Sequence, residues 1–525
     1  MSATTDENGQ ASTTLTQVPQ GGFAVIEATI TNRCNLSFQQ RCQVDFLQSA
    51  PDDWPMFMRD ARHQGFSRTS DTAAITAFGN PVWTQPIDTA TTDRGPWAVN
   101  VHPNPALGST FIFEHPYIDS SPVHASGSPV IVGAWVGGSG SYLNGSKGYV
   151  TAFNPTTGAV QWDYPAGARN NDNLRLLGGI SSTPAIATVN GQQLVFFGCM
   201  DGKVYCLNAA TGTLLWSFQT WKRDDTTAAR IIQSPVVHNG VVYIGNESAR
   251  VYALNATDGT PVWASPFEIQ EAEIEAGTAD MTGVTSIAVA NIAGQVCLYF
   301  GSDYGYLYSV DANTSSQIWA YRPESSGCIE SSPTVYAGNI YFGITRHRAV
   351  NLFALNATTG EPVWTTRLTP PEFPTLGDEI RATCAAMDNA IFIGEDTGHY
   401  FFRVNAQTGE VDPDNTPTNP FDAVGLFGIG TEYFVGSAAL TSAGYALVGN
   451  DNGHLYALSD IDLYQLSSYD TSLGNSPGNN SYICSSPSLT YSAQVGYKWI
   501  YVVSRADNGR QDGRGTLFAF RQLAD

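Results

Sequence analysis

Charged side chains are scarce in this 525-residue sequence, of which Asp, Glu, Lys and Arg make up only 14%, and lysine occurs only four times. Acidic residues outnumber basic ones by 47 to 25, which gives a formal net charge of −22. A field of that sign repels the phosphates of nucleic acids and of anionic lipids. We therefore expect neither a nucleic acid nor an anionic membrane surface as a partner.

Long apolar runs are missing as well. No stretch of 18 apolar residues occurs, so no transmembrane segment is expected. Residues 1–22 are polar and lack the apolar core of an export signal. A cytoplasmic location and an export signal lost from the chain both remain open on this evidence.

Motifs for several chemistries are absent. The sequence has no P-loop, no dinucleotide-binding glycine motif after a strand and no Gly-x-Ser-x-Gly elbow. Its eight histidines show no zinc-type spacing, so no metal site is predicted from them. Eight cysteines are too few for a disulfide scaffold. Two pairs, Cys34 with Cys42 and Cys199 with Cys206, are left open between a local bridge and free thiols.

What the sequence does contain is a repeat of short strands, with many turns supplied by 51 Gly and 28 Pro. Eight segments alternate apolar and polar side chains in the way that a half-buried strand requires. They cover residues 150–155, 204–209, 251–256, 307–312, 352–357, 401–406, 455–460 and 517–522. Self-similarity on this scale predicts a repeat architecture.

A turn with fixed spacing follows most of these segments. Asn bonds its own following backbone and Gly accepts a positive φ, so Asn-x-x-x-Gly predicts a tight reversal between two strands. A Trp four residues after the Gly is expected to pack between neighbouring sheets. The predicted structural residues are Gly158, Gly212, Gly259, Gly360 and Gly409, with Trp83, Trp162, Trp216, Trp263, Trp319 and Trp364. Two copies depart from the pattern, because Ser315 replaces the Gly before Trp319 and the Gly409 copy lacks its Trp.

Each unit holds four expected strands and recurs every 45 to 56 residues, judged by the positions of Trp162, Trp216, Trp263, Trp319 and Trp364. That period is typical of a propeller blade. We therefore predict an all-β fold, an eight-bladed β-propeller of four-stranded blades over residues 51–525, after a polar extension of residues 1–50. The blades are expected at about 119–165, 180–219, 231–266, 284–321, 329–367, 380–412, 435–466 and 484–523.

The ring is expected to close through the N-terminal part of the propeller. The last strand copy, 517–522, has no following Gly and Trp, whereas "FGNPVW" at 78–83 matches "TGEPVW" at 359–364. We predict that residues 78–87 supply the outer strand of the C-terminal blade, which leaves no long sheet edge exposed.

These repeats, such as "VYALNATDGTPVW" at 251–263, resemble the pyrroloquinoline-quinone (PQQ) repeat of the quinoprotein alcohol dehydrogenase-like superfamily, as does the opening "DDWPMFMRDARHQGFS" at 52–67. The resemblance spans roughly residues 52–523. It implies either a quinone-dependent dehydrogenase of alcohols, including polyvinyl alcohol, or a non-catalytic propeller like the lipoprotein of the outer-membrane β-barrel assembly machinery. It also implies a periplasmic or extracellular protein.

Such enzymes hold PQQ at the ring axis beneath a disulfide between adjacent cysteines, with Ca²⁺ bound by Glu, Asn and Asp. This sequence has no Cys-Cys pair. If the repeats superpose, one residue per blade rings the channel mouth: Asp119, Ser181, Ile232, Thr285, Glu330, Arg381, Gly436 and Cys484. Asp119, Glu330 and Arg381 are the charged members and so the catalytic candidates, with Asp119 or Glu330 as general base on an alcohol. Arg381 is expected to pair with Glu330 rather than to share a metal.

Long connections between blades are the other place where a site is expected. They contain Arg175, Trp221 and Arg230, which are candidates for cofactor or partner binding. The first hypothesis is a non-enzymatic scaffold that presents these loops to a protein or glycan partner. The second is a PQQ-dependent dehydrogenase with a divergent axial site. The monomer is the default oligomeric state.

Overall fold

The computed structural model describes residues 23–31, 37–45, 57–58, 60, 62–63, 66–67, 78, 81–86, 120–136, 146–269, 283–323, 327–345, 351–368, 380–395, 400–411, 434, 436–441, 444–450, 453–460, 463, 465–471, 480–483, 485–492, 497–507 and 515–523. The chain divides into two compact units, Met1–Ala50 and Pro51–Asp525. In the smaller unit, β1 (Phe23–Thr31) pairs antiparallel with β2 (Ser37–Asp45).

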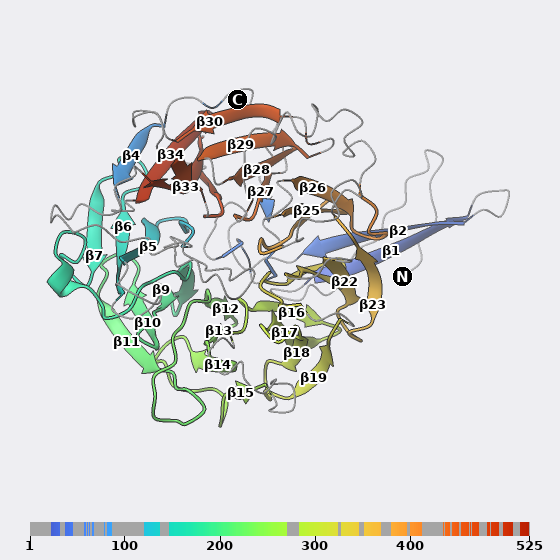
Figure 1. Ribbon diagram of the computed structural model, residues 1–525, viewed down its shortest axis with the longest axis horizontal. Coiled ribbons are helices and arrows are strands. Elements are labelled where there is room, and N and C mark those ends of the chain that lie inside the picture. Colours follow the sequence, from blue (N-terminus) through green and yellow to red (C-terminus); the bar gives the residue numbers. More distant parts are fainter. Residues whose placement is uncertain are drawn as a thin grey trace, which may run out of the picture. The chain divides into compact units, whose positions relative to one another are not determined.

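The larger unit is an eight-bladed β-propeller whose sheets are arranged around a common axis (Figure 1). Blade 1 contains β5 (Val130–Val136), β6 (Lys147–Phe153) and β7 (Val160–Tyr164), and blade 2 contains β8 (Ala185–Val189), β9 (Gln192–Gly198), β10 (Lys203–Asn208) and β11 (Leu214–Gln219). Blade 3 contains β12 (Val236–His238), β13 (Val241–Gly245), β14 (Arg250–Asn255) and β15 (Phe267–Glu268). Blade 4 contains β16 (Ala288–Ile292), β17 (Gln295–Gly301), β18 (Leu307–Asp311) and β19 (Gln317–Tyr321). Blade 5 contains β20 (Thr334–Tyr336), β21 (Asn339–Gly343), β22 (Leu352–Asn356) and β23 (Pro362–Thr366), and blade 6 contains β24 (Ala385–Met387), β25 (Ala390–Gly394) and β26 (Phe401–Asn405). Blade 7 contains β27 (Ala439–Thr441), β28 (Tyr445–Gly449), β29 (His454–Ser459) and β30 (Gln465–Asp470). Blade 8 contains β31 (Asn480–Tyr482), β32 (Ser488–Ser492), β33 (Tyr497–Asp507) and β34 (Gly515–Leu523).

The described part of the chain has no α-helix, so the all-β, eight-bladed prediction is confirmed. Three blades are not regular to their edges. In blade 3 the outermost strand meets β14 only at the bridge Leu254↔Pro261 and at the two-residue β15. In blade 1 the innermost strand is reduced to the bridge Val123↔Ile131, and in blade 6 the outermost is reduced to the bridge Val404↔Val411.

The predicted closure is also confirmed. The strand β4 (Trp83–Pro86) pairs antiparallel with β34, with Ala519 opposite Trp83 and Leu517 opposite Gln85. Figure 1 shows this N-terminal strand beside the C-terminal blade, in blue against red. Strands from the two ends of the propeller chain therefore share one sheet.

The Asn-x-x-x-Gly turns have the geometry that their sequence predicts. In blade 5, Asn356 Oδ1 accepts hydrogen bonds from the backbone N–H groups of Thr358 at 2.9 Å and Thr359 at 3.1 Å. Gly360 then takes a φ of 73°. A residue with a Cβ atom is disfavoured at such a φ. The Asn side chain thus fixes the start of the turn and the glycine allows its end.

Each outer Trp joins its blade to the next one. The indole Nε1 groups donate to backbone carbonyls of the following blade at 2.9 to 3.3 Å, in the pairs Trp83–Pro155, Trp162–Ala209, Trp216–Ala256, Trp263–Ala312, Trp319–Ala357 and Trp364–Ala406. A Cβ atom on Gly158, Gly212, Gly259, Gly360 or Gly409 would lie 2.5 to 2.6 Å from the indole ring packed on it. These glycines therefore provide space for the indole as well as the backbone conformation.

A ring of hydroxyl groups joins the innermost ends of the blades. Ser121, Thr183, Ser234, Ser286, Thr383, Ser437 and Ser486 occupy one repeat position. It lies two residues after the predicted mouth residue, except in blades 4 and 7, where Ser286 and Ser437 lie one residue after it. Backbone N–H groups at this position donate to the hydroxyl of the next blade at 2.8 to 3.2 Å, in six links. The link from Ser486 N–H to Ser121 Oγ, 3.0 Å, joins the last blade to the first. The same seam that β4 closes at the rim is closed here at the axis.

Candidate functional site

The residues that precede the inner strands lie at one end of the ring axis, which we call the mouth. Its described residues are Ser181, Ile232, Thr285, Glu330, Arg381 and Gly436, whereas Asp119 and Cys484 lie outside the described residues. Members from adjacent blades touch, since Ser181 Oγ donates to the Ile232 carbonyl at 3.4 Å and Arg381 Nε donates to Glu330 Oε2 at 2.8 Å. These contacts place Ser181 beside Ile232 and Arg381 beside Glu330, as the superposition predicts. Thr285 stands one position later in the repeat, because its hydroxyl accepts from the Gly301 N–H as that of Ser182 accepts from the Gly198 N–H.

Glu330 is an ion-paired carboxylate. Its side chain is 26% exposed and that of Arg381 is 21% exposed. Thr345 Oγ1 donates to the other carboxylate oxygen, Oε1, at 3.3 Å. The expectation that Arg381 pairs with Glu330 is confirmed, and both Glu330 oxygens are engaged by protein groups.

A Ca²⁺–quinone site does not fit the described residues of the mouth. Calcium takes six to eight oxygen ligands from several groups. The described mouth residues offer one carboxylate, and it is already engaged by Arg381 and Thr345. Within the described ranges, no group of three or more His, Cys, Asp or Glu side chains is close enough to hold a metal ion.

The described residues of segment 57–67, here called the axial segment, lie against the inner strands of blades 5 to 7. Strand β3 (Phe66–Ser67) pairs parallel with β27 of blade 7. The Arg62 carbonyl accepts from Val335 N–H at 2.9 Å, and Thr334 Oγ1 donates to the His63 carbonyl at 3.2 Å, both in blade 5. Met58 packs in the core cluster of blades 6 and 7. One segment therefore touches three inner strands.

Histidines in this region are held neutral. The His63 ring is buried, lies 3.0 Å through Nδ1 from the Pro333 carbonyl, and packs edge-on to Phe57. Burial lowers the pKa of His63 to about 4. Burial, and then the charge of Arg62, lowers the pKa of His238 at the end of β12. The Arg62 guanidinium itself pairs with Asp60 at 3.2 Å.

The connection between blades 2 and 3 forms an ordered platform beside the mouth. Trp221 is 36% exposed, while its backbone N–H donates to the Tyr252 hydroxyl at 3.1 Å. Arg230 Nε pairs with Glu247 Oε2 at 2.5 Å. The two candidates Trp221 and Arg230 thus belong to one surface element, with Trp221 displayed and Arg230 already paired.

Arg250, which the sequence did not single out, anchors this platform. Its side chain is 5% exposed, and its guanidinium donates to the Lys222 carbonyl at 2.9 Å and pairs with Asp225 at 2.6 Å and Glu268 at 2.5 Å. Arg250 precedes the repeat segment at the position that Tyr306 and Asn351 hold in blades 4 and 5, but Lys203 holds it in blade 2, so its charge alone was a weak signal.

Arg175 lies apart from these residues in the connection between blades 1 and 2. It is buried, donates through Nε to the Ala168 carbonyl at 2.9 Å and lies over the Tyr149 ring at 4.8 Å. The structure therefore gives Arg175 a packing role within its own loop. Cys199 and Cys206, left open above, are free buried thiols, and burial raises the pKa of Cys206 to about 12. Cys34 lies outside the described residues.

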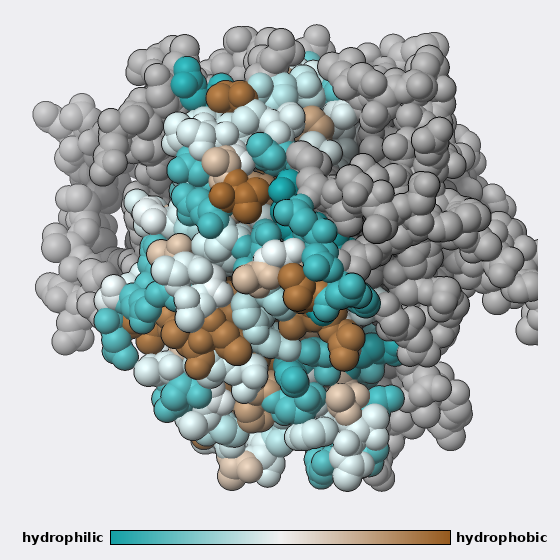
Figure 2. Space-filling view, turned by 90° about the vertical axis from the view of Figure 1, so that its left-hand side faces the viewer, coloured by the Kyte–Doolittle hydropathy of each residue, from teal (hydrophilic) through white to brown (hydrophobic). Residues whose placement is uncertain are grey.

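Exposed apolar side chains fall into two groups. One follows the outer strands at the rim: Val82, Val160, Leu214, Leu215, Val262, Ile318, Val363 and Leu466. The other lies on the connections after blades 1 and 2: Leu174, Leu177, Trp221 and Ile232. Figure 2, which faces the side of β4, β7 and β11, shows hydrophobic surface in separate patches among polar surface. No helix in the described part of the chain is long and apolar enough to cross a membrane.

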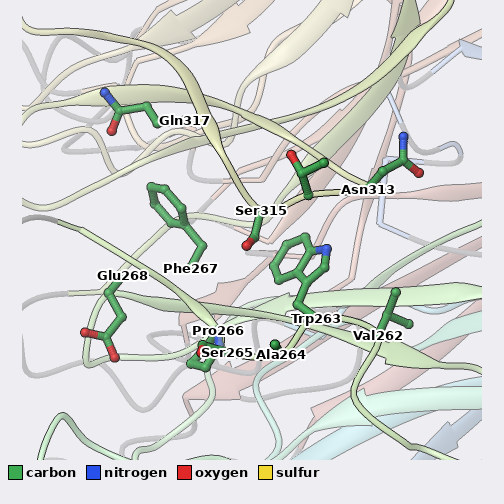
Figure 3. Close-up of a pocket in the computed structure, with 11 residues that line it drawn as sticks. Val262, Trp263, Ala264, Ser265, Pro266, Phe267, Glu268, Asn313, Ser315 and Gln317 are labelled. Atoms are coloured by element: carbon green, nitrogen blue, oxygen red, sulfur yellow. The ribbon is translucent and has the colours of Figure 1, made fainter.

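One pocket lies away from the mouth, at the rim between blades 3 and 4 (Figure 3). It has a volume of about 710 Å³ and is lined by Val262–Glu268 and by the blade 4 turn that contains Ser315. Sequence reasoning noted Ser315 as a departure from the repeat but did not predict a cavity there.

Comparison with known proteins shows which family this chain belongs to. A family model described as outer membrane protein assembly factor BamB matches residues 118–265, 200–282 and 275–426, more than half of the chain. Polyvinylalcohol dehydrogenase from a Pseudomonas species is 25% identical over 167 residues, which are 30% of this chain and 24% of that protein's length.

Among solved structures, a europium-containing methanol dehydrogenase is 12% identical, with a TM-score of 0.59 over 90% of this chain and 98% of that one. The quinohemoprotein alcohol dehydrogenase of Comamonas testosteroni is 15% identical, with a TM-score of 0.58 over 91% of this chain and 82% of that one. At these identities the likeness shows the fold alone. The family match covers most of the propeller. The chain therefore belongs to the family of PQQ-repeat β-propellers whose model is described as outer membrane protein assembly factor BamB.

Proposed function

We propose that this protein is a non-enzymatic binding propeller that recognises a protein partner through the platform beside the mouth. The observation that carries the proposal is the pairing of Glu330 with Arg381 at 2.8 Å. In this ion pair the Glu330 carboxylate, the one carboxylate among the described mouth residues, is held in a contact between blades 5 and 6. A general base would need that carboxylate within reach of its substrate and free to take a proton.

The platform has the features of a recognition surface. Protein interfaces are commonly centred on an exposed aromatic or apolar side chain held on a rigid support. Trp221 and Ile232 are exposed at the two ends of the same connection, and Arg250 anchors the backbone of that connection from below. An indole held in this way can enter a partner's pocket with little loss of conformational entropy.

Binding to a partner tests this directly. Protein recovered with the wild-type chain from extracts of its source organism is identified, and its affinity is then measured by calorimetry. Trp221→Ala should weaken that affinity at least tenfold, because buried aromatic residues dominate interface energies. Leu466→Ala is the matched control, since Leu466 is equally exposed, at 36%, but lies at the rim on β30. Equal losses in the two variants would contradict the proposal.

The dehydrogenase alternative is supported by the partial similarity to polyvinylalcohol dehydrogenase. It predicts that protein reconstituted with PQQ and Ca²⁺ reduces an artificial dye in the presence of alcohols. Reduction that disappears in Glu330→Ala or Asp119→Ala would refute the binding proposal. We expect no such reduction. A periplasmic or extracellular location forms part of the proposal, and fractionation of source cells would test it.

A further inference from the structure

The turn between β18 and β19 of blade 4 departs from the repeat at two positions. In blades 1, 2, 3, 5 and 6 an Asn side chain accepts the backbone hydrogen bonds that start this turn, and a Gly with positive φ ends it. In blade 4 Asp311 accepts these bonds instead, from the N–H groups of Asn313 at 2.8 Å and Thr314 at 2.9 Å. Ser315 takes the glycine position with a φ of 56°, a conformation that disfavours serine relative to glycine. The fold itself therefore gives no reason for a serine here.

The two departures together form the sequence Asn313-Thr314-Ser315, which has the Asn-x-Ser pattern of an acceptor for N-linked glycosylation. That pattern needs an accessible Asn amide and a hydroxyl group two residues after it. Asn313 is exposed, and Asp311 rather than Asn313 holds the turn. Figure 3 shows the Asn313 amide pointing away from the Trp263 ring. A residue in an unfavourable backbone conformation on an exposed turn points to a function of its side chain.

The same pattern begins at three other Asn residues within the described ranges, and there the folded chain already uses the Asn side chain. Asn246 is fully buried and donates through Nδ2 to the Trp221 carbonyl at 3.2 Å, a bond that a glycan on Nδ2 would break. Asn255 and Asn356 are half-buried and hold their repeat turns through Oδ1, each with a hydrogen bond of 2.9 Å from a backbone N–H. Asn313 is therefore the most accessible acceptor among the four.

We propose that Asn313 is an acceptor site for N-linked glycosylation. The donor is an oligosaccharide carried on a lipid diphosphate, and the enzyme is a membrane-bound oligosaccharyltransferase of a secretory pathway. Asn313 Nδ2 bonds to C1 of the first sugar, the bond between C1 and the diphosphate oxygen breaks, and the proton lost from Nδ2 leaves with the lipid diphosphate. The modification requires the extracellular location that forms part of the proposed function. It does not involve the platform, because Asn313 lies at the rim, away from the mouth.

Secretion of the full chain from a glycosylating cell tests the site. The chain is expressed in insect cells behind a secretion signal and a short Asn-Ala-Thr tag, which serves as an internal acceptor of the same kind. Peptide mass spectrometry of secreted protein whose tag carries a glycan should also show a glycan on Asn313 and none on Asn246. Unmodified Asn313 in that protein would overturn the proposal, and the test of partner binding with Trp221→Ala would be unaffected by this result.

Variants separate the acceptor sequence from the fold. Ser315→Gly removes the hydroxyl group and restores the repeat, so it should lose the Asn313 glycan without lowering the melting temperature. Asn313→Gln should lose the same glycan. Gln407→Asn is the matched control, because Gln407 is exposed at the equivalent turn position of blade 6 and Gly409 follows two residues later. Its new side chain should stay unmodified. A glycan that persists on Asn313 in Ser315→Gly would contradict the role given to the serine.

Discussion

At the scale of single residues, the glycines of the repeat turns do two separable things. Gly360 takes a φ of 73°, and a Cβ atom there would lie 2.6 Å from the Trp319 ring. Gly240 takes a similar φ of 77°, but a Cβ atom there would meet nothing within 4 Å. Comparing Gly240 with Gly360 therefore separates the energetic cost of the backbone conformation from that of packing between blades.

We expect Gly240→Ala to lower the free energy of unfolding by about 1–2 kcal/mol, which is the penalty of a left-handed residue with a Cβ atom. Gly360→Ala should lower it by about 3–5 kcal/mol, because overpacking against the indole is added. Urea unfolding followed by fluorescence measures both changes. Similar losses in the two variants would mean that the indole moves aside at little cost.

Glu330 and Arg381 show what the sequence could and could not predict about the candidate site. They occupy the same position in consecutive repeats, so alignment alone predicted that they meet. Arg250, by contrast, binds the Lys222 carbonyl and Asp225, which belong to an irregular connection, and Glu268 of the displaced outer strand β15. Contacts between equivalent positions of the repeat are therefore predictable from the sequence, whereas contacts made by residues that occur only once are not.

At the scale of elements, the axial segment was visible only as a resemblance in its sequence. Its contacts could not be predicted, because residues 57–67 have no counterpart in other blades to align with. The turns and strands were predictable for the opposite reason, since each uses a local rule that recurs. The interrupted outer strand of blade 3 falls between these cases, because Ser315 of the adjoining turn departs from the repeat, but the break in the strand after Pro261 gave no periodic signal.

The buried His63 should make this element sensitive to acid. Its pKa is about 4 in the folded chain and about 6.5 when unfolded, so below pH 6.5 the unfolded state binds more protons. Its contribution to stability is complete above pH 6.5 and is lost as the pH falls from 6.5 to about 4, by up to about 3 kcal/mol. Asp60 offsets part of this loss by attracting the imidazolium, although it also pairs with Arg62.

Unfolding free energies of wild type and His63→Gln, measured from pH 7.5 to pH 4, test this expectation. The difference between the two proteins should shift in favour of His63→Gln as the pH falls, because glutamine carries no proton to the buried site. A difference that stays constant across this range would show that His63 does not titrate between the two states.

At the scale of the whole molecule, the ring depends on β4. Without it, β34 would become an exposed sheet edge, which is a template for pairing with other chains. The rim around it would also lose Trp83, which donates to the Pro155 carbonyl at 3.1 Å and joins blade 8 to blade 1.

A chain in which residues 81–86 are replaced by a glycine–serine linker loses β4 but keeps the axial segment. It should therefore melt at a lower temperature and self-associate, as light scattering and sedimentation would record. A chain that begins at residue 51 keeps β4 and is the control, which we expect to remain monomeric with an unchanged melting temperature. Monodisperse behaviour of the linker variant would contradict the role given to the closing strand.

The shared sheet of blade 8 also determines when the propeller can close during synthesis. Pro86 pairs with Thr516, so β4 stays unpaired until about 430 further residues have been made. At ribosomal rates of 5–20 residues per second, that wait lasts roughly 20 to 90 s. Throughout that interval the nascent chain carries two unmatched edges, β4 at its start and the newest blade at its end. The nascent propeller therefore depends on shielding until its final strand emerges, and a product cut short anywhere along the chain keeps an open edge that a quality-control system could recognise.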